Sequence, residues 1–584
     1  MAVENLITEH IDIWTSAEKT RSTSGRGSSK KLELYGVKKL RELILELAVR
    51  GKLVPQDPND EPASVLLERI AAEKTQLVKE KKIKKQKALP EVTEQEAPFN
   101  VPKGWEWTRL GNLSSDIHYG YTASAKPNSE GVRLLRITDI QNDKVNWGTV
   151  PACDITEEKA KSYLLENDDI LIARTGGTIG KSYLVENIDL QAVFASYLIR
   201  VKRVQAVYAP FTKVFLVSQL YWKQLIENSA GTGQPNVNAT ALKQLLFIVP
   251  PFNQQKRIVA KVDELMALCD QLEQQTEASI EAHQVLVTTL LDTLTNSADA
   301  DELMQNWARI SEHFDTLFTT EESIDQLKQT ILQLAVMGKL VPQDPSDEPA
   351  AELLKRIAVE KAQLVKEKKI KKQKALPPIA EDEKPFELPN GWEWERIGTF
   401  GVVGTGATPS RSNPKYWDDP KYNWVSSGET SELFVSTTKE KVSELAIQET
   451  NVSIYPSGTL IVAMYGQGKT RGQITELTEP AGTNQACAAI QLIEKNESHK
   501  DFVKLYFRKS YEELRSNAAG GAQPNLNVGK VQSTVIAVPP LNEQQRINTK
   551  VNELLTVCDH LKAHFEAVQS TQLHLTDAIV EQVV

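Results

Sequence analysis

The chain has 584 residues, of which 40% are hydrophobic and 25% charged, proportions typical of a soluble globular protein. Its length predicts about three to five folding units, and no apolar run approaches the ~18 residues that a membrane-spanning helix needs. The formal net charge of -9 argues against a general nucleic-acid-binding surface, because phosphate contacts require exposed Lys and Arg. Any nucleic-acid site must therefore be a local patch.

The N-terminal residues 1–31 carry no sign of a targeting signal. They lack the basic-then-apolar pattern of a secretory signal peptide, and residues 20–31 are polar. We therefore predict a flexible N-terminal segment. The four cysteines form no CxxC pair, which suggests neither a disulfide framework nor a metal site, and a reducing cytoplasmic location fits best. They are Cys153, Cys269, Cys487 and Cys558.

An internal repeat organises the rest of the chain. Residues 47–90 and 334–377 are identical at 37 of 44 positions, at an offset of 287 residues. Further matches are GWEWTRLG with GWEWERIG, GQPNVN with AQPNLN, and PPFNQQKRI with PPLNEQQRI. Between these anchors, residues 112–230 and 399–519 have nearly equal length but little identity. A scaffold is therefore kept in both copies while the segments that it carries differ.

A short amphipathic helix is predicted before each variable segment. In each copy four apolar residues recur at helical spacing, and a Gly followed by a Pro a few residues later predicts the helix end at Gly51 or Gly338. The apolar residues are Val37, Leu40, Ile44 and Leu47 in the first copy, and Ile324, Leu327, Ile331 and Leu334 in the second.

The variable segments are predicted to be mixed, with mostly β structure. Short apolar runs at 134–140, 169–174 and 459–465 lie between Gly, Pro, Asn and Asp residues, as strands do. A helical stretch, 211–228 or 502–517, then precedes a Gln-Pro-Asn turn. Each variable segment therefore predicts an α+β domain of about 150 residues.

A long coiled-coil helix of about 40 residues is predicted after each variable segment. Its apolar residues step by four and three, which is a heptad seam. The Pro-Pro pairs at Pro250 and Pro539 predict a break between a strand and this helix. The seam residues are Ile547, Val551, Leu554, Cys558, Leu561, Phe565, Val568, Gln572, Leu575 and Ile579, and in the first copy Ile258, Val262, Leu265, Cys269 and Leu272, with a return at Leu286 and Leu290.

Together these elements predict an α+β protein in which two mixed domains are joined by long antiparallel coiled-coil helices, with an internal pseudo-two-fold repeat. Such a repeat suits duplex DNA, whose backbone has local two-fold symmetry, and domains with different loops would recognise two different half-sites. Helices of about 60 Å would fix the gap between the half-sites. The predicted divisions are a flexible segment (1–31), a helical region (32–98), a first mixed domain (99–250), a central long helix with connector (251–321), a second helical region (322–385), a second mixed domain (386–539) and a C-terminal long helix (540–584).

These residues resemble the specificity subunits of Type I restriction-modification systems over essentially the whole chain from about Lys31. The most specific stretch is GTGATPSRSNPKYWDDPKYNWVSSGE from Gly404, followed by YPSGTLIVAMYGQGKTRGQI. The first half offers YGYTASAK, LLRITDI and DDILIARTGGTIGKS. The extended helical segment before each variable domain departs from a minimal member of the family.

The resemblance implies a non-catalytic, DNA-binding subunit with two target-recognition domains, each reading one half of a bipartite site. It implies helical regions that hold two modification subunits, which would carry an S-adenosylmethionine-dependent adenine methyltransferase. Restriction subunits would add ATP-driven translocation and cleavage, with Mg2+. No cofactor is then expected on this chain itself.

The sequence contains near matches to two catalytic motifs, but each lacks a required residue or element. An adenine methyltransferase needs Asn or Asp before Pro-Pro and an aromatic residue, whereas Val249 and Val538 stand there. Residues 463–470, AMYGQGKT, fit a permissive phosphate-binding loop, but residues 471–474 predict a returning strand rather than the helix that such a loop requires. A methyltransferase or nuclease with an unrecognised site remains one alternative, and a coiled-coil scaffold that binds only proteins is the other.

Candidate base contacts lie in Gly-rich and Ser/Thr-rich loops. Arg and Lys pair with guanine, and Asn and Gln with adenine. The Lys-rich runs at 79–87 and 366–374 either bind phosphates or partner surfaces, or are solvated helix ends. If partners supply most phosphate contacts, the acidic net charge is explained, and the isolated chain should bind weakly. The candidates are Tyr119, Tyr121, Lys126, Arg174 and Lys181 in the first domain, and Ser410, Arg411, Gln467, Lys469 and Arg471 in the second.

Overall fold

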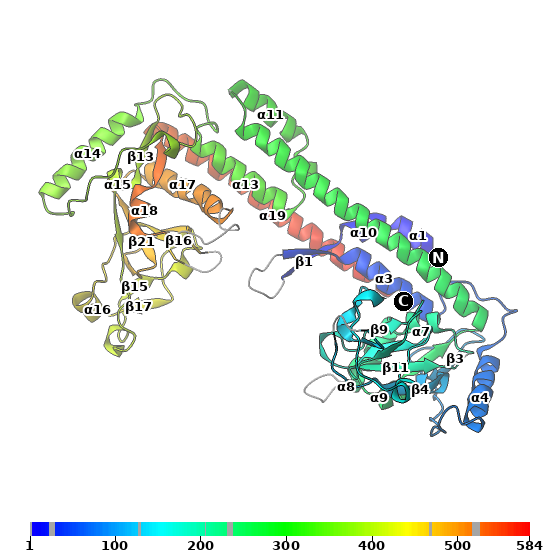
Figure 1. Cartoon of the computed structure of the whole chain (residues 1–584). Helices are drawn as coiled ribbons and strands as arrows, with labels where there is room; N and C mark the ends of the chain where they lie inside the picture. The colour runs from blue at the N-terminus through cyan, green and yellow to red at the C-terminus, as the bar shows by residue number, and fades with distance from the viewer. Residues whose placement is uncertain are drawn as a thin grey trace. The chain divides into compact units, whose positions relative to one another are not determined.

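The computed structural model of the chain describes residues 3–22, 30–126, 130–204, 206–229, 237–298, 300–465, 470–516 and 526–583. The chain forms two compact units, one of residues 1–279 with 568–584 and the other of residues 280–567. The boundary falls inside each of two long helices, α10 (Phe252–Thr295) and α19 (Leu541–Val583), drawn green and red in Figure 1. They have 44 and 43 residues, which confirms the predicted length.

In the first unit, helix α3 (Tyr35–Val49) joins both long helices. The Arg41 guanidinium lies 2.7 Å from the carboxylates of Asp270 and Glu273 in α10, and the Tyr35 hydroxyl donates a 2.8 Å hydrogen bond to Asp577 in α19. The four apolar residues predicted for this helix are all at most 2% exposed. As predicted, Gly51 follows the helix, and its positive φ of 70° suits a residue without a Cβ.

In the second unit, helix α13 (Glu321–Val336) has the equivalent place. Lys328 lies 2.6 Å from Asp559 in α19, and these two residues are the counterparts of Arg41 and Asp270. Lys562 reaches Glu321 at 3.0 Å, so α13 and α19 run antiparallel. The repeat therefore extends to the ion pairs between helices.

The end of α10 packs beside α13 in the same direction. Gln284 donates to Glu322, and Thr288 donates to Gln326 four residues further along both helices. Since α13 runs against α19, α10 and α19 are antiparallel within this unit. This arrangement confirms the predicted antiparallel helices.

The heptad seam is correct in the first half of each long helix and shifts by one residue in the second. Ile258, Cys269, Ile547 and Cys558 are at most 1% exposed, as predicted. Further along, the predicted Leu286 and Leu575 are 50% and 45% exposed, whereas Val287 and Thr576 are at most 1% exposed. The partner helix changes between α3 and α13 along each long helix, and a straight α-helix drifts relative to a 3.5-residue repeat. The buried face therefore rotates.

Each variable segment starts and ends on a two-stranded antiparallel ribbon. In the first unit β3 (Glu106–Arg109) pairs with β12 (Leu246–Val249), and in the second β13 (Glu393–Arg396) pairs with β22 (Val535–Val538). The repeated GWEW anchors lead into β3 and β13, and each Pro-Pro pair separates a strand from a long helix as predicted.

A buried tryptophan next to each ribbon donates a hydrogen bond to the long helix that follows. Trp105 donates from Nε1 to Gln254 at 2.9 Å, whereas its counterpart Trp392 donates to the Glu543 carboxylate at 3.0 Å. Gln254 and Glu543 are both 1% exposed. Burial raises the pKa of Glu543 above its ordinary value, so this carboxylate is costly to keep charged.

The first mixed domain is built on an antiparallel sheet with strand order β4-β11-β8-β9. The second has a five-stranded sheet, β14-β21-β18-β19-β16, and a three-stranded sheet, β17-β15-β20. The strands of the first domain are β4 (Ser114–Tyr119), β5 (Arg133–Leu135), β6 (Ile140–Gln141), β7 (Lys144–Val145), β8 (Ile170–Ala173), β9 (Ser182–Leu184), β10 (Ala192–Phe194) and β11 (Leu198–Arg203). Those of the second are β14 (Gly401–Thr405), β15 (Tyr422–Val425), β16 (Phe434–Val435), β17 (Glu440–Val442), β18 (Leu460–Ala463), β19 (Ile474–Leu477), β20 (Ala481–Thr483) and β21 (Cys487–Leu492).

The remaining helices cover the sheets or extend from the frame, and the combination of sheets and helices in two repeated domains confirms the α+β class. None of the helices within the described ranges has the length and apolar character that a bilayer span requires. These helices are α4 (Ala63–Lys79), α5 (Leu110–Leu113), α6 (Glu157–Ala160), α7 (Ala209–Phe215), α8 (Gln219–Ser229), α9 (Ala239–Gln244), α11 (Ala300–Glu312), α12 (Phe314–Leu317), α14 (Ala350–Lys366), α15 (Ile397–Phe400), α16 (Glu444–Glu449), α17 (Glu497–Ser516) and α18 (Val528–Ser533).

The described residues 3–22 and 30–31 of the predicted flexible N-terminal segment have regular secondary structure. They form α1 (Val3–Glu9), α2 (Ile11–Ser16), β1 (Glu18–Ser22) and the start of β2 (Lys30–Leu34). Trp14 is fully buried, and a Cβ on Gly36 of α3 would meet the Trp14 carbonyl oxygen at 2.3 Å. The polar composition of the segment gave no indication that Trp14 is buried or that Gly36 makes room for it. Residues 23–29 lie outside the described residues.

The buried His499 predicts a pH dependence in the second unit. Its Nδ1 lies 3.1 Å from Gln544 Oε1, and its Nε2 is buried without a partner among the described residues. Burial lowers the pKa of His499 below 6.5, although the hydrogen bond with Gln544 and the charge of Glu494 oppose this shift. The unfolded state therefore binds the proton first as pH falls through 6.5, and folding loses up to about 1.4 kcal/mol per pH unit below it.

This loss is measured by urea unfolding between pH 7.5 and 5.5. A His499→Gln variant cannot titrate, so its stability should change less with pH than that of the parent chain. An equal slope in both proteins would contradict the prediction.

Candidate nucleic-acid interface

A hairpin lies at the same place in each mixed domain. In the first domain residues 174–181 connect the antiparallel strands β8 and β9, and in the second residues 464–473 connect β18 and β19. Gly176 and Gly180 have positive φ values, as tight loops require. The Gly-rich hairpin predicted for the first domain is confirmed, and a strand returns in the second domain, although it begins at Ile474 and not at Arg471. A phosphate-binding loop would have a helix there.

Three segments converge on Arg174 in the first domain. Its guanidinium lies 4.6 Å from the centroid of the Tyr119 ring, at the end of β4. The Tyr119 hydroxyl accepts a 3.2 Å hydrogen bond from the Ala239 N–H, which begins α9. The backbone of Arg174 accepts from the Val237 N–H and donates to the Tyr197 carbonyl, both at 3.1 Å. The hairpin is therefore held by the main chain while its guanidinium stacks on an aromatic ring.

Tyr197 is a further candidate that the sequence reasoning missed. Its side chain is 63% exposed, on the turn between β10 and β11 that bonds to Arg174, whereas Tyr119 is 37% exposed. The available signal was the polar pair Ser196-Tyr197 between two apolar strand runs. An exposed tyrosine next to a stacked arginine supplies a donor, an acceptor and a flat surface for a nucleic-acid partner.

The other predicted residues of the first domain have different surroundings. Tyr121 is half-buried, with its ring 5.5 Å from that of Tyr163. Lys126 forms an ion pair with Asp154 at 2.5 Å. Lys181 is exposed at the end of the hairpin. The structure thus groups Arg174 with Tyr119 and gives Tyr121 a packing role.

In the second domain the predicted Arg411 is already paired. Both terminal nitrogens donate to the carboxylate of Glu440, at 2.6 and 2.8 Å, and the guanidinium lies 3.8 Å from the Trp417 ring centroid. The Arg411 guanidinium lowers the pKa of Glu440 below its ordinary value. Arg411 must leave Glu440 to pair with a base in the same bidentate manner.

Of the remaining predicted residues of the second domain, the structure describes Ser410 and Arg471. Ser410 is exposed, and its Oγ lies 2.7 Å from that of Ser412. Arg471 is half-buried just before β19. Gln467 and Lys469 lie outside the described residues, as do both Gln-Pro-Asn turns.

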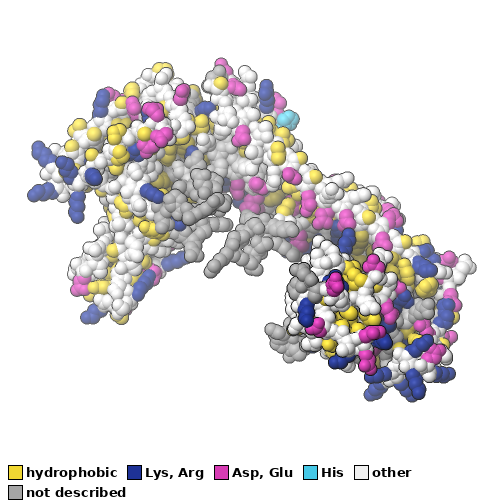
Figure 2. Space-filling model, in the orientation of Figure 1, with side chains coloured by type: hydrophobic (Ala, Val, Ile, Leu, Met, Phe, Trp, Pro, Cys, Tyr) yellow, Lys and Arg dark blue, Asp and Glu magenta, His cyan; other side chains and the backbone are white. Residues whose placement is uncertain are grey.

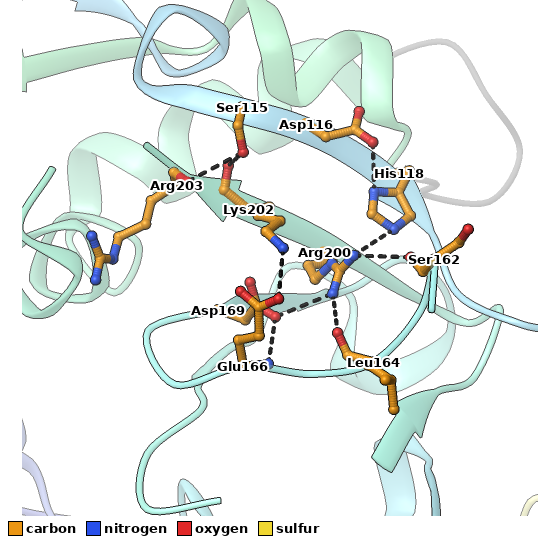
Figure 3. Close-up of polar contacts among 10 residues, drawn as sticks. All are labelled: Ser115, Asp116, His118, Ser162, Leu164, Glu166, Asp169, Arg200, Lys202 and Arg203. Atoms are coloured by element: carbon orange, nitrogen blue, oxygen red, sulfur yellow. Dashed lines mark hydrogen bonds and ion pairs between the residues drawn. The ribbon is translucent and has the colours of Figure 1, made fainter. Parts of the chain in front are cut away.

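A buried polar network supports the sheet that carries the first hairpin (Figure 3). Arg200 of β11 donates to the carbonyls of Leu164 and Ser162 at 2.6 and 3.0 Å, and to Asp169 at 3.2 Å. It also lies 3.2 Å from His118 Nε2 in β4. The side chains of Arg200 and Asp169 are each 4% exposed, and burial raises the pKa of Asp169. Since Asp169 directly precedes β8, this network fixes the strand that leads into the hairpin.

Comparison with known proteins identifies the family. The family model for the Type I restriction modification DNA specificity domain matches residues 102–282 and 389–567. The chain belongs to the Type I restriction-modification specificity subunits. Two relatives from Escherichia coli cover all of this chain and 99% of their own length: the EcoEI specificity subunit, 42% identical, and the EcoAI specificity subunit, 41% identical.

The crystal structure of an HsdS subunit from Thermoanaerobacter tengcongensis is 17% identical, with a TM-score of 0.41, over 84% of this chain and 98% of that one. As a specificity subunit, the chain has a DNA-recognition role in a Type I system and not a catalytic one, as predicted. The resemblance stated from the sequence is thereby confirmed over the full length.

Proposed function

We propose that each mixed domain of this specificity subunit contacts one half of a bipartite, asymmetric DNA site. The observation that carries the proposal is the pair of hairpins. Both lie on sheets anchored by equivalent ribbons and tryptophans, yet their residues differ, with Arg174 and Lys181 in one and Arg471 in the other. Equivalent positions with different side chains suit two different half-sites.

The proposed contacts in the first domain are Arg174, with Tyr119 and Tyr197 beside it. In the second domain they are Ser410 and Arg411 on one loop, and Gln467, Lys469 and Arg471 in the sequence between β18 and β19. Arginine recognises guanine through two parallel hydrogen bonds, and glutamine recognises adenine in the same way. The exposed Lys126 and Lys181 remain candidates, whereas Tyr121 contributes less because its ring packs against that of Tyr163.

The long helices are the proposed docking region for two modification subunits, through which restriction subunits join the complex. S-adenosylmethionine, ATP and Mg2+ then bind to those partners and not to this chain. Partners that surround the duplex supply much of the phosphate contact, which reconciles DNA recognition with a net charge of -9.

Exchanging residues 104–250 for those of a relative should change one half of the methylated sequence and leave the other half intact. The exchanged segment begins and ends on the β3–β12 ribbon, so the frame is preserved. The measurement is a map of methylated adenines in cells that carry the complete system. The matched control exchanges residues 391–539 and should change the other half. If neither exchange moved the methylated sequence, the domains would not recognise DNA and the protein-scaffold alternative would gain support.

A further inference from the structure

Two Lys-rich segments follow helices α4 and α14. Residues 79–87 and 366–374 share the sequence KEKKIKKQK, with six lysines and one glutamate in nine residues. All six lysines are exposed in both copies. In Figure 2, Lys and Arg side chains crowd the surface around the C-terminal ends of α14 and α4. Each segment is thus a strongly basic patch in a chain of negative net charge.

The segments are attached to the mixed domains by their non-lysine residues. Gln86 donates a 2.8 Å hydrogen bond to the Ser115 carbonyl at the start of β4, and accepts one from Lys74, which also donates to the Gly111 carbonyl. Ile83 is half-buried. The chain is therefore held against the domain while the lysines face outward, which a merely solvated linker would not need.

The second copy repeats the attachment through the helix lysine. Gln373 accepts a 3.1 Å hydrogen bond from Lys361, which donates to the Gly398 carbonyl at 2.6 Å. Both copies also place a lysine in the left-handed region after the helix, Lys81 with φ 57° and Lys368 with φ 60°. Glycine or asparagine is the usual residue in that conformation. The backbone therefore leaves the helix in the same conformation in both copies.

Charge and composition favour DNA phosphates over a protein surface. The exposed side chains of each run are lysines, one glutamate and no aromatic residue, whereas protein interfaces are depleted of lysine and centred on aromatic residues, methionine and arginine. Phosphate contacts carry no sequence information, so one invariant segment can serve two different half-sites. This explains why the runs are identical while the hairpins differ.

The first Lys-rich run is bonded to β4, the strand that also carries part of the candidate interface. Ser115 and Tyr119 are both in β4, with the run bonded at Ser115 and the Arg174 stack at Tyr119. Helix α9 begins beside Tyr119. Near its other end Lys243 packs so close to Gly111 that a Cβ on this glycine would meet the Lys243 carbonyl oxygen at 3.0 Å. One edge of the domain therefore connects the basic run with the candidate base contacts.

We propose that each Lys-rich segment binds the phosphate backbone of the duplex that its own mixed domain recognises. The proposal rests on DNA recognition by the mixed domains and adds a sequence-independent contact to it. Lys84, Lys85 and Lys87 act in the first copy, and Lys371, Lys372 and Lys374 in the second.

The test measures DNA binding by the assembled complex as a function of salt. Changing Lys84, Lys85 and Lys87 to Gln should make the slope of log K against log salt less negative by up to about 2.7, because each lost phosphate contact removes about 0.9. We expect affinity to fall at least about tenfold at low salt, equally for specific and non-specific duplexes. The equivalent change in the second copy should have a similar effect, and the Lys→Arg triple variant, which keeps the charge, should bind as the parent does.

Two results would overturn the proposal. An unchanged slope in the Gln variants would show that the lysines do not contact phosphates. Loss of the modification subunits from the Gln variants, measured as the mass of the assembly, would show that the runs dock a protein instead. Failure of the underlying domain function is seen separately, since the domain exchange would then leave the methylated sequence unmoved whatever the salt slope.

Discussion

Changing Arg200 to Met should destabilise the first mixed domain by about 3–5 kcal/mol, the usual cost of removing one partner from a buried ion pair. The side chain of Asp169 is 4% exposed, and its pKa is already raised by burial, so the carboxylate depends on Arg200 for compensation. The carbonyls of Leu164 and Ser162 lose a donor at the same time. Urea unfolding of the full chain measures the loss, and methylation of the bipartite site should be lost at elevated temperature.

A neighbouring ion pair on the same strand provides the control. Lys202 lies 3.0 Å from Glu166, but their side chains are 34% and 64% exposed, so Lys202→Gln should cost no more than about 1 kcal/mol. Adding Asp169→Asn to Arg200→Met removes the unpaired charge and should restore part of the stability. If the Arg200 variant were no less stable than the Lys202 variant, the buried network would not hold the sheet together.

Replacing Trp392 with Ala should cost about 3–5 kcal/mol through the cavity alone. The indole is 5% exposed, and its Nε1 donates to the buried Glu543 carboxylate. Without that donor the pKa of Glu543 rises further, which adds a penalty at neutral pH. Because the pKa of Glu543 is raised in the folded state, the folded protein takes up a proton there more readily than the unfolded chain. The additional penalty should therefore shrink as pH falls toward 4.5.

Trp105→Ala is the matched variant, because the two tryptophans are repeat counterparts and Trp105 donates to the neutral Gln254. At pH 7 this variant should lose less free energy of unfolding than Trp392→Ala. The difference between the two losses, measured by urea unfolding, should be smaller at pH 5. Adding Glu543→Gln to Trp392→Ala should abolish this pH dependence. A constant difference across this range would mean that Glu543 is not responsible.

The frame was predictable because it depends on local patterns that occur twice. Apolar spacing located α3, α13 and the long helices, and the Pro-Pro pairs located the ends of the ribbons. The heptad shift at Val287 and Thr576 was not predictable, because the buried face depends on which helix packs there. Trp14 was missed for a related reason, since its burial depends on a close approach to Gly36 that composition does not reveal.

The candidate interface was predictable as loops but not as side-chain positions. The pairing of Arg411 with Glu440 joins residues 29 apart, and the contact between Arg174 and Tyr197 joins two turns. Such contacts depend on how the sheet folds, which no local pattern encodes. The Arg200 network was missed because the run Leu198–Arg203 has the alternation of an ordinary strand, although Arg200 points into the core.

The ribbon of β3 and β12 has an evolutionary consequence. Neighbouring strands lie about 4.8 Å apart, so the chain leaves the scaffold and returns to it at almost the same point. An inserted fold whose two ends lie that close together meets the condition that the ribbon imposes, although it must also accept the frame contacts of Lys74 and Gln86. With the proposed division of DNA recognition between the two domains, recombination of the coding segment between these strands would give a new specificity while the long helices stay unchanged.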